Sequence, residues 1–486
     1  MVAHKSVKSL KVMSMNSASI IAKSSIEFGT SGARGLVENF SDELCFAFTL
    51  AFIATQPDVK KVAIAIDNRP SSPKIAQACF SALKAKGIDV VFYGVLPTPA
   101  LAYAAQEEKI PAIMVTGSHI PFDRNGLKFY TASGEITKSD EQLILVTKTS
   151  VENIELLMLP DVDSHAFNLY LKRYTSVYHS QMLAGKKIGV YQHSSAGRQL
   201  YPHLFEALGA EVICLGYSDE FVPIDTEAVA ESDRQQAHKW VAEHQLDALF
   251  STDGDGDRPL LADEHGDYFT GDILCMLASK SLNIDAIATP VSCISSIEGS
   301  RFFQYVCRTK IGSPYVIEQF SKLSNKYSNV AGFEANGGFL LASDIDVDGQ
   351  ILKSLPTRDA VLPVLAILSL ANAEPLSNLR MLLPQRFTFS DRLKNIDKEK
   401  STNLIKGSIK STQFLLAILG LQSMTITEVI TLDGLRIIFD NQQVIHLRPS
   451  GNAPELRCYS ESHTAEGAKA LVHNSLNALE KYFNMQ

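Results

Sequence analysis

The chain has 486 residues, of which 45% are hydrophobic and 20% are charged, and its formal net charge is −8 at pH 7. This length predicts several domains rather than one core, and the composition is that of an ordinary globular protein. The negative charge provides no basic field for nucleic acid or an anionic membrane, and no run approaches the roughly 18 apolar residues of a membrane span.

The N-terminal segment, residues 1–25, contains lysines and serines but no acidic residue. A transit peptide would also need arginines and an amphipathic period, and neither is present. We therefore expect a disordered extension or an over-long start, with Met13 or Met15 as alternative first residues. The seven cysteines are scattered without a C-x-x-C pair, which favours free thiols in a reducing compartment and hence a cytoplasmic location.

An α/β plan repeats along the first two thirds of the chain. The first copy has apolar strands at 62–66 and 90–93 around a helix at 75–86, and the second has strands at 188–191 and 212–215 around a helix at 199–208. A weaker third copy runs from residue 286 through the loop 292–296 towards 306. Continuous apolar strands joined by helices indicate parallel sheets that are covered on both faces.

The C-terminal part has a different order of elements. After residue 386 the pattern predicts a strand, a helix at 402–419, strands at 425–431 and 435–440, a loop, a strand at 455–460 and a helix at 465–482. This order is typical of an α+β domain. We place boundaries near Leu159, Tyr268 and Pro384, which gives domain I (26–159), domain II (160–268), domain III (269–384) and domain IV (385–486).

One acidic loop is the strongest indication of chemistry. Residues 251–258 read S-T-D-G-D-G-D-R, so three carboxylates alternate with glycines in a tight turn. Two unit charges about 4 Å apart repel by roughly 1 kcal/mol in water and ~4 kcal/mol near a protein surface. A cation between them would relieve this repulsion, and an all-oxygen site favours Mg²⁺ or Ca²⁺.

A calcium EF-hand is the alternative interpretation of this loop, because Glu264 falls at its twelfth position. Arg258, however, occupies the sixth position, where the turn needs glycine, and strands rather than helices are expected on both sides. A second acidic stretch, Asp344-x-Asp346-x-Asp348-Gly349, has Leu355 at position twelve and is interpreted as a solvated turn.

Three more polar loops follow predicted strands. Thr116-Gly-Ser-His-Ile-Pro121 presents a hydroxyl at the carboxyl edge of a sheet, where α/β proteins bind ligands. Residues 332–338, G-F-E-A-N-G-G, present a glutamate and an amide, and a plain hairpin turn explains them equally well. Residues 448–457, R-P-S-G-N-A-P-E-L-R, combine two arginines with free backbone N–H groups, as an anion site requires.

Together, in this order and spacing, the four loops resemble those of the α-D-phosphohexomutase superfamily, which includes the phosphomannomutases and phosphoglucomutases. The resemblance extends from Phe28-Gly-Thr-Ser-Gly-Ala-Arg-Gly35 to the loop that begins at Arg448. It implies four domains around a central cleft: three related α/β domains with mixed sheets, and an α+β domain that closes over the substrate.

The resemblance also implies roles for individual residues. Ser118 matches the serine that is phosphorylated in the resting enzyme and that shares the Mg²⁺ ion with Asp253, Asp255 and Asp257. The basic and acid/base residues near the reacting phosphoryl group are Arg34, Lys128 and His119, with Lys128 preferred as acid/base. The expected substrate-binding residues are Arg258, Lys310, Glu334, Asn336, Arg448, Ser450, Gly451, Asn452 and Arg457.

The chain departs from the common family pattern at Ile120, Ser313, Asn336 and Gly338, so the sugar preference is the least certain implication. The serine and glutamate loops resemble those of bacterial phosphomannomutases, which implies mannose phosphates as substrates and a hexose 1,6-bisphosphate as intermediate. The alternatives are glucose or glucosamine phosphates, a metal-dependent phosphatase, and a binding protein without activity. We expect a monomer or weak homodimer with small phosphosugars as its only partners.

Overall fold

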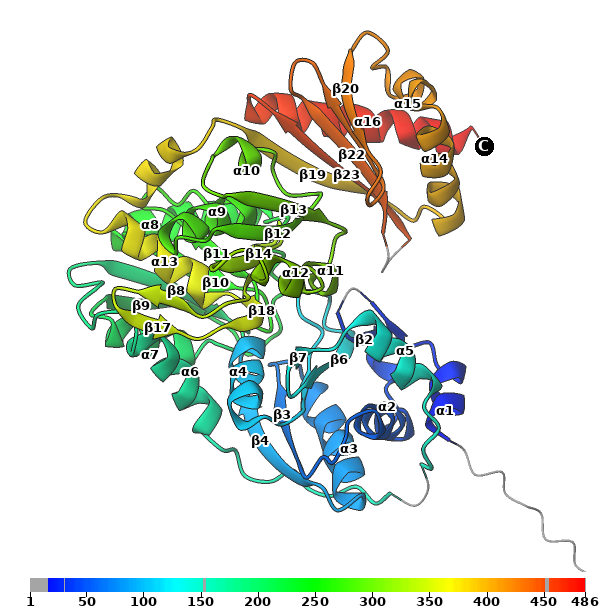
Figure 1. Ribbon diagram of the computed structural model, residues 1–486, viewed down its shortest axis with the longest axis vertical. Coiled ribbons are helices and arrows are strands. Elements are labelled where there is room, and N and C mark those ends of the chain that lie inside the picture. Colours follow the sequence, from blue (N-terminus) through cyan, green and yellow to red (C-terminus); the bar gives the residue numbers. More distant parts are fainter. Residues whose placement is uncertain (1–15, 30, 152–153, 451–453, 486) are drawn as a thin grey trace, which may run out of the picture.

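The computed structural model describes residues 16–29, 31–151, 154–450 and 454–485. One principal sheet lies within each of the four predicted ranges, and we keep the names domain I to IV for them; their boundaries stay predictions. Figure 1 shows the fourth sheet at one end of the molecule, the first at the other, and the second and third on one side. The predicted class, three α/β units with mixed sheets and a final α+β unit, is confirmed.

Domain I is built on a seven-stranded sheet of order β1-β2-β6-β5-β3-β4, with β7 paired to β6. β3 runs parallel to β4 and β5, whereas β6 is antiparallel to β5. The first predicted copy of the repeat is β3-α3-β4. The elements are β1 (Glu27–Phe28), β2 (Ala33–Leu36), η1 (Val37–Asn39), α2 (Asp42–Ala54), β3 (Lys61–Ile66), α3 (Ser72–Ala85), β4 (Asp89–Val95), α4 (Thr98–Glu108), β5 (Ala112–Val115), β6 (Arg124–Thr131), β7 (Gly134–Glu135) and α5 (Lys138–Val146).

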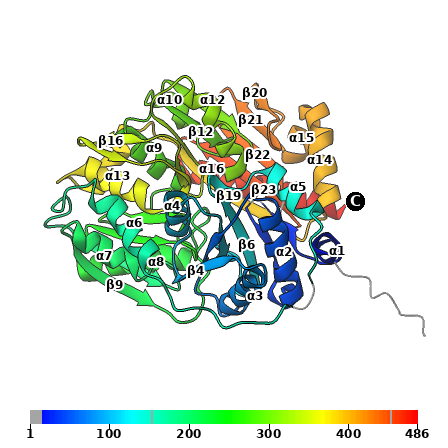
Figure 2. The same cartoon turned by 60° about the horizontal axis from the view of Figure 1, so that its bottom comes forward.

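The prediction of a disordered extension is wrong for Ser17–Lys23, which form a helix. Helix α1 (Ser17–Lys23) starts after Asn16, whose side chain accepts a hydrogen bond from the Ser19 N–H. It buries Ile20 and Ile21 in the core that α2 and α3 share, and it lies beside α2 (Figure 2). An N-cap followed by two isoleucines is enough for a short helix when a core is available, although seven residues are too few for a recognisable period. Residues 1–15 lie outside the described residues.

Domain II has a four-stranded sheet of order β11-β10-β8-β9, in which only β11 is antiparallel to its neighbour. The predicted second copy of the repeat is β8-α7-β9. The elements are α6 (His165–Thr175), β8 (Lys187–His193), α7 (Leu200–Ala207), β9 (Glu211–Tyr217), α8 (Glu231–His244), β10 (Ala248–Thr252) and β11 (Pro259–Ala262).

Domain III has a five-stranded sheet of order β13-β12-β14-β15-β18 and a separate hairpin, β16-β17. Asp348 and Gly349 form the hairpin turn with positive φ, so the second acidic stretch is the solvent-facing turn that we predicted. The elements are α9 (Gly271–Ser281), β12 (Ala286–Pro290), α10 (Ser296–Gly299), β13 (Tyr305–Thr309), α11 (Ser313–Ile317), α12 (Phe320–Ser324), β14 (Val330–Phe333), β15 (Phe339–Leu341), β16 (Ile345–Val347), β17 (Gln350–Leu352), β18 (Leu355–Asp359), α13 (Val361–Ala371) and η2 (Leu376–Leu382).

Domain IV is an antiparallel sheet of order β19-β23-β22-β21-β20 with three helices. Two sequence predictions are wrong here. The helix predicted at 402–419 is two helices that meet at Ser411, where ψ is 91°, and the segment predicted as a loop contains the central strand β22. The elements are β19 (Phe387–Lys394), α14 (Lys398–Lys410), α15 (Thr412–Leu419), β20 (Ile426–Ile430), β21 (Leu435–Phe439), β22 (Val444–Pro449), β23 (Glu455–Ser462) and α16 (Ala465–Asn484).

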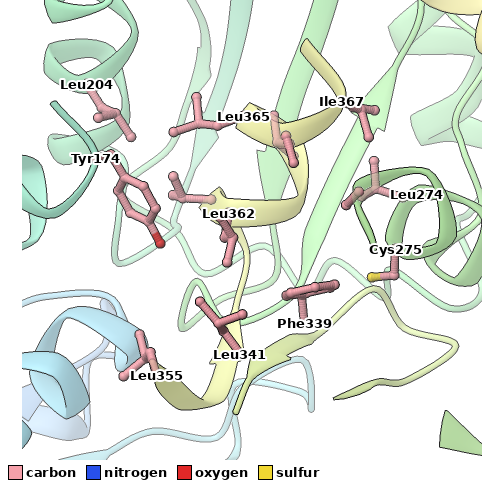
Figure 3. Close-up of a cluster of buried hydrophobic side chains, with 14 of the residues drawn as sticks. Tyr174, Leu204, Leu274, Cys275, Phe339, Leu341, Leu355, Leu362, Leu365 and Ile367 are labelled. Atoms are coloured by element: carbon pink, nitrogen blue, oxygen red, sulfur yellow. The ribbon is translucent and has the colours of Figure 1, made fainter. Parts of the chain in front are cut away.

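Domains I to III share one continuous hydrophobic core in addition to a smaller cluster within each of them, whereas the core of domain IV lies within that domain alone. The shared core extends from Ala63 to Leu383, and the core of domain IV lies between Leu404 and Phe483. Figure 3 shows Leu362 and Leu365 of α13 between Tyr174 of α6 and Leu274 of α9. No single helix of the described residues is long and apolar enough to cross a membrane; α13 and η2 reach that length only together, and they meet at an angle of 89°.

Candidate active site

Ser118, the serine predicted to be phosphorylated, lies on a strained turn at the carboxyl end of β5. Its φ is +54°, which is uncommon for a residue other than glycine. Its N–H donates to Thr116 Oγ1 at 2.7 Å, and its carbonyl oxygen accepts from Arg69 Nη2 at 2.9 Å. The side chain is completely buried, and Oγ donates to Asp253 Oδ2 at 2.7 Å. The turn therefore directs the serine hydroxyl at the acidic loop.

The pair that builds this turn, Asp67 and Arg69, was missed in the sequence. Asp67 accepts from Thr116 Oγ1 at 2.7 Å and from Arg69 Nε at 3.1 Å. A Cβ on Gly117 would lie 2.5 Å from Arg69 Cζ, so only glycine leaves room for the guanidinium. Arg69 donates to four backbone carbonyls of the loop, those of Ser118, Ile120, Pro121 and Arg124. Their position in the sequence could have identified them. Both residues follow the end of β3, which is parallel to β5, so they lie at the same sheet edge as the Ser118 loop.

The acidic loop joins β10 to β11 and lies against Ser118. Asp253, Asp255 and Asp257 are at most 1% exposed, and each offers one oxygen such that the three atoms lie within 4.8 Å of one another. A Cβ on Gly254 would lie 2.7 Å from the Ser118 carbonyl oxygen. The alternation of aspartate and glycine thus lets three carboxylates converge while the serine loop packs against their backbone.

This donor set fits a divalent cation. Among the described residues, Asp255 Oδ1 and Asp257 Oδ1 are buried without a hydrogen-bond partner, which is costly for a carboxylate oxygen. The carboxylates and the serine side chain form an all-oxygen set, as Mg²⁺ prefers. Because strands flank the loop on both sides, it is not an EF-hand.

The three carboxylates have different electrostatic environments. Burial, followed by repulsion from Asp255 and Asp257, raises the pKa of Asp253 well above its usual range. Burial also disfavours the ionised form of Asp255, but Lys128 and Thr98 outweigh it and lower the pKa of that group. At Asp257 burial is outweighed by Arg358 and Lys128, so its pKa is lowered. Asp253, whose Oδ2 faces Ser118, is therefore the carboxylate with the least compensating positive charge.

Lys128 lies on β6 and contacts the acidic loop directly. Its Nζ lies 2.6 Å from Asp255 Oδ2 and 2.7 Å from Asp257 Oδ2, and its side chain is 1% exposed. Two of its three N–H donors are therefore bound to carboxylates. This arrangement balances charge, while the acid/base role of Lys128 stays a prediction.

A further group near the acidic loop comprises His119, Arg34 and Arg258. His119 Nδ1 accepts from Arg258 Nη1 at 2.8 Å and lies 3.4 Å from Ser118 Oγ. Burial, then Arg258 and Arg34, lower the pKa of His119 well below its usual range, so the ring is neutral. Burial and Arg258 lower the pKa of Arg34 to about 10. The two arginines therefore place positive charge close to the acidic loop, as the transfer of an anionic phosphoryl group requires.

The loop 332–338 brings Glu334 and Asn336 to the acidic loop from domain III. Glu334 Oε2 accepts from Arg358 Nη1 at 3.1 Å, and Asn336 Oδ1 accepts from the Gly338 N–H at 3.0 Å. Arg358, which the sequence analysis missed, also donates to Asp257 Oδ2 at 3.0 Å. Its signal in the sequence was a charged pair, Arg358-Asp359, just before the apolar run of α13.

Domain IV contributes a row of arginines. Arg448 on β22 and Arg457 on β23 are cross-strand neighbours, and Arg392 on β19 is the next neighbour of Arg457, so the three share one face of the sheet. Burial opposes the charge on Arg457, but Tyr459 and Glu227 raise its pKa. Arg392 was not predicted, because only strand pairing reveals the row.

The other predicted residues of this region are placed as follows. Lys310 is exposed, with Nζ 5.8 Å from the centre of the Tyr315 ring. The next residue, Ile311, donates its N–H to Asp433 Oδ2 at 2.9 Å, and Asp433 Oδ1 accepts from Arg448 Nε at 3.0 Å. The Ser450 N–H donates to the Glu455 carbonyl at 2.8 Å. Gly451 and Asn452 lie outside the described residues.

A cavity of about 390 Å³ separates domain IV from domains II and III. Its walls include Glu227 of domain II, Ala335 of domain III, and His446 and Tyr459 of domain IV. It borders the glutamate loop through Ala335, whereas Ser118 does not line it. Arg392 and Arg457 of the arginine row line a second, smaller cavity of about 50 Å³. Ser118 and the acidic loop are thus buried against each other, and the larger cavity lies next to domain IV.

Four parts of the chain match successive domains described for phosphoglucomutase/phosphomannomutase: alpha/beta/alpha domain I (residues 25–154), domain II (168–266) and domain III (270–387), and the C-terminal domain (404–478). A phosphomannomutase of Salmonella muenchen is 52% identical over 468 residues, which cover 96% of this chain and 98% of that protein.

Two solved structures are similar throughout their length. A phosphoglucomutase/phosphomannomutase family protein from Burkholderia thailandensis has a TM-score of 0.69 and 20% identity, covering 93% of this chain and 97% of that one. N-acetylphosphoglucosamine mutase of Aspergillus fumigatus, in complex with GlcNAc-6P and magnesium, has a TM-score of 0.58 and 11% identity, covering 95% and 98%. With all four domains matched in order and a buried acidic triad beside a serine, the chain belongs to the phosphoglucomutase/phosphomannomutase family and is a metal-dependent phosphohexomutase.

Proposed function

We propose that the chain is a phosphomannomutase that interconverts mannose 6-phosphate and mannose 1-phosphate through a phosphorylated Ser118 and a mannose 1,6-bisphosphate. The observation that carries the reaction is the 2.7 Å contact between Ser118 Oγ and Asp253, inside a buried triad of carboxylates. The choice of mannose rests on the 52% identity to the Salmonella phosphomannomutase over nearly the whole chain.

In the proposed reaction the bond between Ser118 Oγ and phosphorus breaks while a hydroxyl oxygen of the hexose phosphate forms its bond to phosphorus. Asp253, Asp255, Asp257 and the serine side chain would hold Mg²⁺, which neutralises charge on the transferring phosphoryl group when bound. Arg34 and Arg258 would stabilise the phosphoryl oxygens through their positive charge.

The hydroxyl proton must pass to a base. In the proposed exchange the Lys128 ammonium gives a proton to the leaving Ser118 Oγ and then takes up the hydroxyl proton of the hexose. His119 is the second choice, because its Nδ1 lone pair already accepts from Arg258.

The bisphosphate then turns round, and Ser118 takes the other phosphate. Glu334 and Asn336 hold the sugar hydroxyls. Arg448, Ser450, Gly451, Asn452 and Arg457, with Lys310 nearby, bind the phosphate that does not react. Because that phosphate is on C6 in one half-reaction and on C1 in the other, domain IV should recognise phosphate more strictly than sugar.

A phosphatase is the competing activity. The completely buried Ser118, hydrogen-bonded to Asp253, favours the mutase, because a phosphoserine there would be shielded from water. Glucose phosphates, alone or with mannose phosphates, are the nearest alternative substrates, and glucosamine phosphates come next. The proposed setting is the cytoplasm, with the protein as a monomer or weak homodimer.

The test is a Ser118→Ala protein assayed with mannose 1-phosphate and a catalytic amount of mannose 1,6-bisphosphate. We expect the mutase rate to fall by at least ~10⁴-fold while mannose 1-phosphate still binds, because the substitution removes the phosphoryl carrier and leaves the arginine row unchanged. Full activity in this variant would overturn the scheme, and release of free phosphate by the wild type would indicate the phosphatase. Parallel kcat/KM values for mannose, glucose and glucosamine phosphates identify the preferred sugar.

A further inference from the structure

One buried guanidinium links the acidic loop of domain II to the glutamate loop of domain III. Arg358 is 1% exposed, and its Nε lies 3.0 Å from Asp257 Oδ2. Its Nη1 lies 3.1 Å from Glu334 Oε2 and 3.4 Å from Ser313 Oγ. The planar fork of an arginine can satisfy two carboxylates in fixed directions, which a lysine ammonium cannot.

The surrounding residues are shaped for this side chain. A Cβ on Gly338 would lie 2.5 Å from Arg358 Cδ and 2.6 Å from Cγ, so any larger residue there would displace the arginine. Ser313, which is completely buried, leaves room on the other side. The absence of side-chain bulk at both positions is the reason that the guanidinium can pass between the two loops.

The backbone at Arg358 is anchored from domain II as well. The next residue, Asp359, accepts hydrogen bonds from Tyr170 Oη at 2.6 Å and from Tyr174 Oη, both on α6. It also accepts from the Val361 N–H at 2.9 Å, at the start of α13. Arg358 thus extends from a rigid base, and rotation of its side chain cannot absorb a movement of either loop.

The two carboxylates depend on Arg358 to different degrees. Asp257 has two further cationic partners, Lys128 at 2.7 Å and Arg258 at 3.6 Å. Among the described residues, Arg358 is the only side chain that forms an ion pair with Glu334. A shift of Asp257 is therefore transmitted to Glu334 through a single group.

We propose that Arg358 is a positioning residue that couples the metal site to the sugar site, so that a divalent cation at the aspartates and a phosphosugar at Glu334 strengthen each other's binding. This inference rests on the proposed function, which places the sugar hydroxyls at Glu334. Coupling between two sites is reciprocal: each ligand changes the affinity of the other by the same factor.

The experiment measures that factor by calorimetry with dephosphorylated protein, to which no bisphosphate is added. Mg²⁺ is titrated with and without saturating mannose 6-phosphate, then mannose 6-phosphate with and without Mg²⁺, and the heats of the two ligands without protein are subtracted. For the wild type we expect each ligand to raise the binding affinity of the other by about tenfold. Arg358→Lys keeps the positive charge but loses the planar fork. This variant should still bind both ligands, but each ligand should change the affinity of the other by less than about twofold.

Two further variants separate coupling from general damage. Gly338→Ala retains Arg358, but the added Cβ displaces the arginine side chain. This variant should therefore lose the coupling as Arg358→Lys does. Arg380→Met is the matched control. Arg380 pairs with Asp263 at 3.0 Å and so also joins domain III to domain II, but away from the three aspartates of the acidic loop. This variant should show the same coupling between the two ligands as the wild type.

Wild-type coupling in Arg358→Lys or in Gly338→Ala would overturn the proposal, as would a wild type whose two ligands bind independently. Failure of the proposed function has a different signature. If the wild type shows the coupling but converts no mannose 6-phosphate with added bisphosphate, the mutase assignment fails and the role of Arg358 stands.

Discussion

The two halves of the site are built in different ways. The half proposed to hold the metal, which comprises Ser118, the three aspartates, Lys128 and Arg358, is almost fully buried beside the core that domains I to III share. The half proposed to bind phosphate, which is the arginine row of domain IV, stands on a separate core, and Arg392 and Arg457 line a small cavity of about 50 Å³.

Within the part of the chain that the structure describes, the side-chain hydrogen bonds between domain IV and domain III come from a small set of residues. Asp433 links Ile311 to Arg448, and Glu461 and Arg436 bond to Ser295 and to the Val291 carbonyl. The difference suits the proposed reaction. Phosphoryl transfer requires a fixed arrangement of charges, whereas a bisphosphate that turns round requires a phosphate site that can open and close.

The largest effect is expected in the metal half. Asp255→Asn removes one charge from the triad, and we expect kcat/KM to fall by about 10³-fold, mainly through kcat. The fold should be retained, because Thr98 Oγ1 can still donate to the remaining amide oxygen. Steady-state kinetics, circular dichroism and a Mg²⁺ titration test this prediction, and activity within tenfold of the wild type would contradict it.

The next largest effect is expected in the phosphate half. Arg457→Ala should lower kcat/KM by about 10²-fold, with most of the change in KM, because the lost group holds the substrate rather than the transferring phosphoryl group. Arg392→Ala is the matched comparison, since Arg392 stands in the same row but its side chain is 33% exposed. It should change KM by less than about fivefold. Equal effects of the two variants would show that the row binds phosphate as one unit.

A smaller effect is expected where the two halves meet. Asp433→Ala removes the acceptor for the Ile311 N–H and for Arg448 Nε, at a cost of about 1.4 kcal/mol, which corresponds to about a tenfold change in kcat/KM. The melting temperature should change little, because the contact lies outside both cores. A variant with unchanged kinetics would show that other contacts position domain IV.

The smallest effect concerns pH. His446 is completely buried on β22, and burial lowers its pKa to about 4, below the ordinary value of about 6.5. The unfolded chain therefore binds more protons between pH 6.5 and 4, and stability is lost as the pH falls through this window. We expect the unfolding free energy to decrease by about 1 kcal/mol from this group between pH 7 and 5.5. Urea titrations of the wild type and of His446→Asn measure it; an equal pH slope in both would contradict the prediction.

The sequence by itself determined the elements that depend on local pattern. The repeated strands and helices, the alternation of aspartate and glycine at 253–257, and the position of Ser118 after β5 were all predicted from apolar runs and from the residues that end them. Local chemistry was sufficient because parallel strands bring their carboxyl ends to one edge whatever the details of packing.

Tertiary structure alone decided the rest. Arg358, Arg69 and Arg392 gain their contacts from strand pairing and from glycines far away in the chain, so no nearby pattern marks them. Helix α1 and strand β22 formed against expectation because each found a core or a neighbouring strand to pack on. A buried charge is tolerated only where partners from several segments converge, and that convergence is a property of the folded chain.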